Sequence, residues 1–290
     1  MGEHDPISHD SRPALCKQGT VLVFPAETYL RLISQRVSIL ILIIATVFGA
    51  NFYSVAAFWP LQAQKLFGPG AVKISYDLLP YGYGLIVGIV VFNWALSLFP
   101  GAIREFLALS SAMLTAGIGA MAAVTPNTPA LARGLSFLAA VGSGGLISPL
   151  TTVLTCVTPD DLIGTVTAII TAVRYLGASI GYAVYFTVLQ RKLAEVLDNN
   201  VVTAAIDAGL PPNETTGFAQ ALLGSDLTAL DAFPPSIVDA GQEAVKMSYQ
   251  ESFKLVYLVS IAFGAFAFVC CLFLGNVKKL IVNKLAVDIH

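Results

Sequence analysis

Six stretches of this sequence are long and apolar enough to cross the hydrocarbon core of a bilayer, which takes roughly 20 helical residues. The connections at 100–105, 125–130 and 156–162 are so short that they can only reverse the chain, so neighbouring helices should be antiparallel. The pattern therefore predicts an all-α, polytopic membrane protein built as a six-helix transmembrane bundle. The six predicted spans are residues 37–60, 76–99, 106–124, 131–155, 163–189 and 252–275.

The polar segments predict how the chain is divided across the membrane. Basic residues flank the spans at Arg31 and Arg36 and in the tail at Lys278, Lys279 and Lys284, which favours a cytoplasmic location for both ends. Asn213 begins the triplet Asn-Glu-Thr, a glycosylation acceptor, which fits an external location. The expected organisation is a cytoplasmic segment at 1–36, five transmembrane helices within 37–189, one large extracytoplasmic polar loop at 190–251, a sixth helix at 252–275 and a cytoplasmic tail at 276–290.

Composition argues against several function classes. The chain is 56% hydrophobic and only 12% charged, with a net charge of −2 and no basic block, so nucleic acid is not an expected partner. The three histidines lie at the chain ends, and the four cysteines lack metal-ligand spacing. We therefore expect no metal site, no cofactor and no enzymatic activity.

Arg174 is the one charged residue deep within a predicted span. Asp77, Arg133 and Lys254 each lie within three residues of a span end, so a buried proton-carrying carboxylate is not expected. A central arginine costs roughly 2.5–3.5 kcal/mol on insertion scales, which makes function the first hypothesis. The alternative is that its guanidinium only bonds backbone carbonyls or snorkels to the surface.

Helical periodicity predicts where Arg174 points. At 100° per residue, one stripe of the fifth span carries Arg174 with hydroxyl-bearing and small residues, while the opposite stripe is Ile, Val and Leu. The first stripe should face a polar cavity. Uncharged polar residues on the first two spans could line the same cavity, although such groups often only tie helices together. The predicted cavity residues are Arg174, Thr171, Tyr182, Tyr185, Asn51, Ser54, Tyr83 and Asn93.

Glycines within the spans are interpreted as packing positions. Gly84 and Gly88 form one GxxxG pair and Gly177 and Gly181 another, which lets neighbouring backbones approach closely where lipid gives no hydrophobic drive to associate. Pro149 removes one helical hydrogen bond from the fourth span and is assigned with them to packing or a kink.

The stretch CVTPDDLIGTVTAIITAVRYLGASIGYAV resembles the eleventh core helix of the major facilitator superfamily. Together with FYSVAAFWP, LLPYGYG and GSGGLISPLTTVLT, it is similar to the C-terminal half of fungal fourteen-span drug and toxin efflux transporters. The resemblance implies proton-coupled export of small organic molecules across the plasma membrane, with a substrate site between two halves. The first-half signatures of that family are absent from this chain.

Two functions therefore remain open. The chain is either the C-terminal half of an exporter, which would pair with a missing N-terminal half or with itself, or a truncated, transport-inactive membrane subunit or gene fragment that assembles with other membrane proteins. Membrane lipid and a small-molecule substrate are the other expected partners.

Overall fold

The computed structural model describes residues 36–68, 70–99, 101–158, 162–224 and 233–274. Nearly all of the predicted N-terminal segment and tail thus lie outside the described residues. Within the described ranges every regular element is helical, and six helices are long and apolar enough to span a membrane. They are α2 (Arg36–Phe67), α3 (Ala71–Leu98), α4 (Ile103–Ala120), α5 (Pro129–Val157), α6 (Ile163–Asp207) and α9 (Pro235–Leu272). The predicted all-α, six-helix membrane fold is confirmed.

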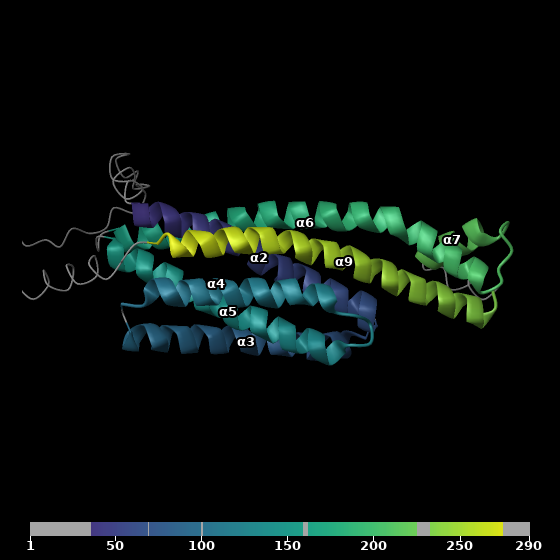
Figure 1. Cartoon of the computed structure of the whole chain (residues 1–290), viewed down its shortest axis with the longest axis horizontal. Helices are drawn as coiled ribbons and strands as arrows, with labels where there is room; N and C mark the ends of the chain where they lie inside the picture. Colours follow the sequence, from purple (N-terminus) through teal and green to yellow (C-terminus); the bar gives the residue numbers. More distant parts are fainter. Residues whose placement is uncertain (1–35, 69, 100, 159–161, 225–232, 275–290) are drawn as a thin grey trace, which may run out of the picture.

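The bundle consists of two groups of three helices, which Figure 1 shows lying side by side along the long axis. In one group α3 and α4 both pack on α5, and in the other α6 and α9 both pack on α2. Contact between α4 and α9 joins the groups along one side, and α2 also meets α5. Helices α5 and α2 are therefore the most enclosed, whereas α3 and α6 leave most of their span surface unburied.

Glycines set the two tightest helix contacts. A Cβ atom added at Gly84 would lie 2.7 Å from the carbonyl oxygen of Phe137, and one added at Gly88 would collide with the backbone of Val141, so this pair lies against α5. Gly177 and Gly181 lie in the same way against Thr46 and Ala50 of α2. Each GxxxG pair thus faces the central helix of its own group, where any side chain would force the helices apart.

Pro149 lies within α5, which continues as one helix from Pro129 to Val157. Prolines at position 60 of α2 and position 80 of α3 are accommodated in the same way. A proline within a membrane helix is tolerated because neighbouring helices and side chains can satisfy the freed carbonyl.

The segment 190–251, predicted as one polar loop that contains helix-like pieces such as SIVDAGQEAVKM, carries regular helices. Helix α6 continues to Asp207, α7 spans Thr215–Gly224, and α9 begins at Pro235, so most of the segment is helical. The physical reason is amphipathic periodicity within a polar composition: apolar residues spaced by three or four positions meet in a small core separate from that of the bundle. This core includes Val201, Ala205, Leu210, Phe218, Ile237 and Ala244. We call the described part of 190–251 the helical cap.

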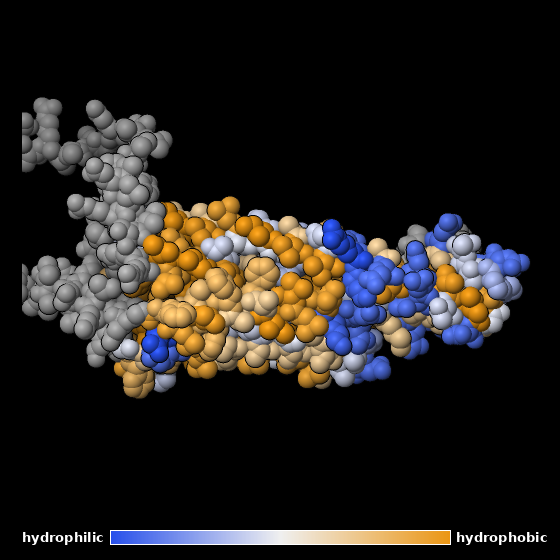
Figure 2. All heavy atoms as spheres, turned by 45° about the horizontal axis from the view of Figure 1, so that its top comes forward, coloured by the Kyte–Doolittle hydropathy of each residue, from blue (hydrophilic) through white to orange (hydrophobic). Residues whose placement is uncertain are grey.

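Figure 2 shows the boundary between bundle and cap as a change in surface character. Hydrophobic residues cover the visible face of the bundle, and hydrophilic residues gather over the end where α6 and α9 extend beyond the other helices. Asn213 is exposed at the turn between α6 and α7. Exposure is what a glycosylation acceptor needs, and its modification stays a prediction.

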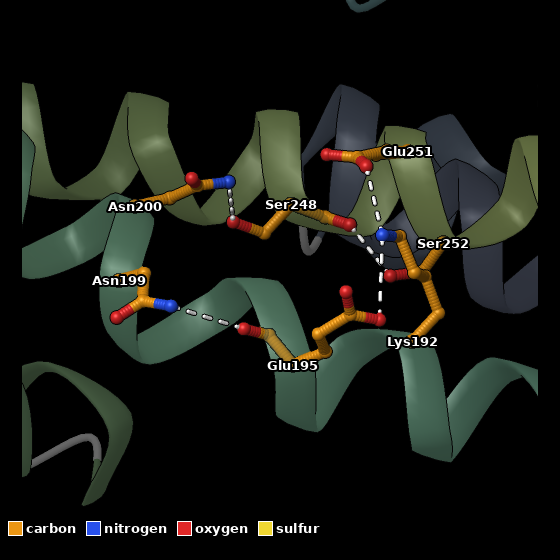
Figure 3. A network of polar contacts seen from close by, with 7 residues as sticks. All are labelled: Lys192, Glu195, Asn199, Asn200, Ser248, Glu251 and Ser252. Atoms are coloured by element: carbon orange, nitrogen blue, oxygen red, sulfur yellow. Dashed lines mark hydrogen bonds and ion pairs between the residues drawn. The ribbon is translucent and has the colours of Figure 1, made fainter.

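Polar contacts hold α6 and α9 together where they enter the cap (Figure 3). The ammonium group of Lys192 lies 3.4 Å from a carboxylate oxygen of Glu195 on the same helix and 3.2 Å from one of Glu251 on α9. Further out, the amide of Asn200 donates to the hydroxyl of Ser248 at 3.0 Å. These contacts fix the register of the two helices just outside the apolar bundle.

The glycine contacts generate a stability prediction. Gly177→Ala should lower the thermal unfolding temperature of the purified protein in detergent, because the new methyl group would overlap the backbone of Thr46. The matched control is Gly134→Ala in α5, where an added Cβ meets nothing within 4 Å, so only the higher helix propensity of alanine should act. Equal unfolding temperatures for the two variants would contradict the close-contact explanation.

Candidate functional site

Arg174 lies in the part of α6 that packs on α2. Close approach at Gly177 brings α6 onto α2, and it also places the backbone carbonyl of Arg174 directly against Gly49. The side chain leaves α6 toward α5, where its Nη2 donates to the carbonyl oxygen of Ile147 and to Oγ1 of Thr151, both at 3.3 Å. Arg174 therefore bridges the two three-helix groups.

The guanidinium is only partly satisfied by these contacts. Its central carbon lies 5.6 Å from the centre of the Phe48 ring, within cation–π range, but its Nε is buried without a hydrogen-bond partner. Among the described residues no carboxylate lies within ion-pair distance of Arg174. A guanidinium stays charged and has five N–H donors, so this one retains capacity to bind a further acceptor.

The acceptor on α5 is a helix carbonyl, but it is not the one that proline frees. Pro149 lacks the N–H that would otherwise bond the carbonyl four residues earlier, at Gly145, whereas Arg174 bonds Ile147. The Ile147 oxygen also accepts from Thr151 Oγ1 at 3.1 Å. Thr151 and Ile147 thus form one polar spot on α5 that receives the guanidinium.

A chain of aromatic rings continues from Phe48, the ring that the guanidinium contacts, along the α2 side. Tyr53 of α2 and Tyr175 of α6 have ring centres 5.8 Å apart, and Phe52 lies 5.1 Å from Tyr53 and 6.4 Å from Tyr81 of α3. Tyr175 is 55% exposed, so the group is open on that side. We call these residues the Arg174 cluster: Arg174, Phe48, Phe52, Tyr53, Tyr81, Thr151 and Tyr175.

Three predicted cavity residues instead form a buried tie between helices. The hydroxyl of Tyr185 donates to Oδ1 of Asn51 at 2.8 Å, and the Ser54 hydroxyl donates to the carbonyl oxygen of Asn51 at 2.7 Å. None of the three is more than 1% exposed. In this arrangement they hold α6 against α2 and do not join the Arg174 cluster.

The remaining predicted residues are also dispersed. Thr171 bonds the carbonyl of Thr167 in its own helix, and Asn93 accepts from Ser148 of α5 at 3.2 Å. Tyr83 is 62% exposed on the outer side of α3. Tyr182 is partly exposed two turns beyond Arg174 and stacks on Phe58, with ring centres 5.5 Å apart. Of the predicted residues on α6, Thr171 therefore lies one turn from Arg174 and is likewise partly buried, whereas Tyr182 lies two turns away.

Sequence reasoning missed the partners that give Arg174 its surroundings. Phe48 and Phe52 are one helical turn apart and present rings to one side of α2, but within an apolar span such spacing is typical of ordinary packing. Thr151 offered no distinguishing signal, because it is one of several hydroxyl residues on α5. Their importance comes from the contact between helices, which one span's periodicity does not specify.

The cluster can bind a small organic molecule in two ways. The arginine offers donors to an anionic or carbonyl oxygen, and the exposed aromatic rings offer faces for stacking an apolar or planar group. Among the described residues no group of three metal-ligating side chains comes together. The cluster thus places hydrogen-bond donors and an exposed ring face close to one another.

Six helices that are long and apolar enough to cross a membrane, with a polar, aromatic cluster contributed by four of them, define a multi-pass membrane protein. The profile of the fungal trichothecene efflux pump (TRI12) family matches residues 23–290. The chain belongs to this family.

Two curated relatives agree with this assignment. The "MFS-type transporter prx5" of Penicillium rubens is 24% identical over 239 residues, which cover 80% of this chain and 43% of the relative. The "Trichothecene efflux pump TRI12" of Trichoderma arundinaceum is 24% identical over 238 residues, which cover 79% of this chain and 39% of the relative. The aligned region is thus less than half the length of either relative, and the predicted likeness to fungal efflux members of the major facilitator superfamily is confirmed.

The bridge between α6 and α5 can be measured with a double-mutant cycle. Thr151→Val should destabilise the purified protein by about 1–2 kcal/mol, because it removes an acceptor of a charged donor. That loss should shrink in an Arg174→Met background, since the shared interaction is already gone. The matched control is Thr152→Val, whose hydroxyl makes the same bond to the carbonyl four residues earlier but does not touch Arg174. Additive effects of Thr151→Val and Arg174→Met would show that the bridge contributes nothing.

Proposed function

We propose that this chain forms one half of an exporter of small organic molecules, with the Arg174 cluster lining the substrate passage. The observation that carries the proposal is a partly buried, incompletely satisfied guanidinium beside an exposed tyrosine, more than two turns inside a spanning helix. A charge at this depth is retained where it faces a polar passage or a partner. The large unburied surfaces of α3 and α6 support a second half lying against this bundle.

The finer parts of the proposal follow from the family. Both curated relatives are named as transporters, one of them an efflux pump, which supports export and a non-enzymatic role. In two-half transporters the substrate site lies at the interface near the bilayer midplane, where Arg174 is expected to lie. We propose proton-coupled export at the plasma membrane, with the described chain contributing the C-terminal half of the site.

A second candidate is a transport-inactive membrane subunit, or a gene fragment, that assembles with other membrane proteins. The observation that favours it is the alignment with only 43% and 39% of the two relatives. An open reading frame for six further spans directly upstream in the genome would decide for the exporter half.

Export activity tests the role of Arg174. Co-expression of this chain with the N-terminal half of a relative should give substrate efflux, and Arg174→Ala should abolish it at matched surface expression. Arg174→Lys should restore little, because lysine lacks the planar fork of donors. The chain alone in liposomes is expected to show no saturable, pH-driven flux, since one bundle offers half a passage. Efflux at the wild-type rate by Arg174→Ala would leave the arginine with a structural role only.

The orientation of the cap is tested by labelling intact cells. In a background without native cysteines, Asp207→Cys in the cap should react with a membrane-impermeant maleimide, whereas Gly101→Cys at the other end of the bundle should not. Both positions are exposed, so accessibility within the protein does not bias the comparison. Labelling at position 101 alone would reverse the proposed topology.

A further inference from the structure

Asp77 is a buried carboxylate that the sequence placed at the edge of a span. Helix α3 begins at Ala71, five residues before the predicted start, so Asp77 lies inside its second turn. The residue is only 4% exposed. The expectation that no carboxylate is buried among the spans is therefore wrong, and the reason is the early start of the helix.

The surroundings of Asp77 leave it incompletely satisfied. One carboxylate oxygen, Oδ1, lies 3.7 Å from Nε of Arg133 on α5, which is longer than a hydrogen bond. The other, Oδ2, is buried without any hydrogen-bond partner. One turn deeper on α3, the hydroxyl of Tyr81 is also buried without a partner. Burying an oxygen that carries charge without a donor is costly, and a proton on Oδ2 removes that charge.

The neighbouring helices bring one charged group to Asp77. From α5 this is Arg133, whose side chain is one-third exposed. Of the two charged residues of α2, Arg36 begins the helix at its opposite end, and Lys65 lies over the Tyr249 ring of α9. The ionic side chains of α4, Arg104 and Glu105, belong to its first turn, at the opposite end of the bundle from the start of α3.

On α3 itself, three titratable groups are close in sequence, and one of them, Tyr76, is 63% exposed. Lys73 donates to the carbonyl of Phe67 across the turn, and Tyr81 points its hydroxyl into the packed interior. Arg133 is therefore the charged group that these contacts bring to the Asp77 carboxylate.

We propose that Asp77 is a proton-binding site that controls the attachment of α3 to α5. A proton from the water at the cap end of the bundle binds Oδ2 and converts the carboxylate to a neutral carboxylic acid. Arg133 keeps its charge, so the ion pair is lost. Proton binding stands on the geometry alone, whereas a part in driving export rests on the proposed function.

Few residues hold α3 against the rest of the bundle, so loss of the ion pair should free its first turns. Its buried residues are Asp77, Gly84, Gly88 and Phe92, all on the side toward the bundle. The glycine pair holds the middle of the helix against α5, and the ion pair holds its first turns. When the ion pair is lost, the end of α3 near Ala71 is free to move about the glycine contact.

Infrared spectroscopy of the purified chain tests proton binding without any transport. Between high and low pH, the wild-type protein should gain the band of a protonated carboxyl in an apolar environment, and Asp77→Asn should lose this band. The matched control is Glu105→Gln, which removes an exposed carboxylate and should keep it. An identical difference spectrum for wild type and Asp77→Asn would overturn the proposal, because Asp77 would then be a permanently charged structural partner of Arg133.

Spin-label distances test the movement. Labels at Val72 of α3 and Leu131 of α5, both exposed, should show a distance distribution that shifts to longer values at low pH. Asp77→Asn should show the shifted distribution at every pH, because asparagine matches the shape of the protonated acid. Arg133→Gln should also show it at high pH. If both variants kept the wild-type distance distribution, Asp77 would not control the attachment of α3, even if it bound a proton. Neither measurement depends on efflux in the co-expression assay.

Discussion

Close backbone contact at glycine is the interaction on which the rest of this bundle depends. In hydrocarbon, apolar side chains gain nothing by leaving lipid for protein, so helices associate where their backbones can approach and pack. Gly84 and Gly88 provide that approach for α3 on α5, and Gly177 and Gly181 provide it for α6 on α2. The depth and rotation of α6 that follow from this contact direct Arg174 across to α5.

The two contacts repeat one pattern. YGYGLIVG in α3 and RYLGASIG in α6 share the glycine spacing, and Tyr81 and Arg174 each stand three residues before the first of those glycines. Both side chains lie beside phenylalanines of α2, at Phe52 and Phe48. The same glycine-based packing therefore places the Tyr81 phenol of one helix group and the Arg174 guanidinium of the other beside the same stretch of α2.

The sequence predicted those features that a single span carries by itself. Apolar length identified the six helices, and the GxxxG spacing identified the packing positions. Features that depend on the contact between two spans were not predicted. The stripe on α6 grouped Arg174 with Tyr185, but Tyr185 bonds Asn51 and Arg174 bonds Thr151. Polar composition indicated a loop, because the core of the cap forms only where apolar residues of separate helices, such as Val201 of α6 and Phe218 of α7, meet. Asp77 was predicted at the edge of a span because the apolar window began at residue 76, whereas α3 begins at Ala71.

The continuity of α6 has a mechanical consequence. Its 45 residues form one helix from the bundle into the cap, and the Lys192 contacts fasten α9 beside it, so the pair acts as a stiff lever. The stretch from Gln190 to Asp207 projects about 26 Å at 1.5 Å per residue, so a 10° tilt within the membrane displaces its far end by about 5 Å. A small rotation of α6 is therefore larger at the cap than within the membrane. An antibody fragment bound to the cap would restrict the movement of the bundle without entering the membrane.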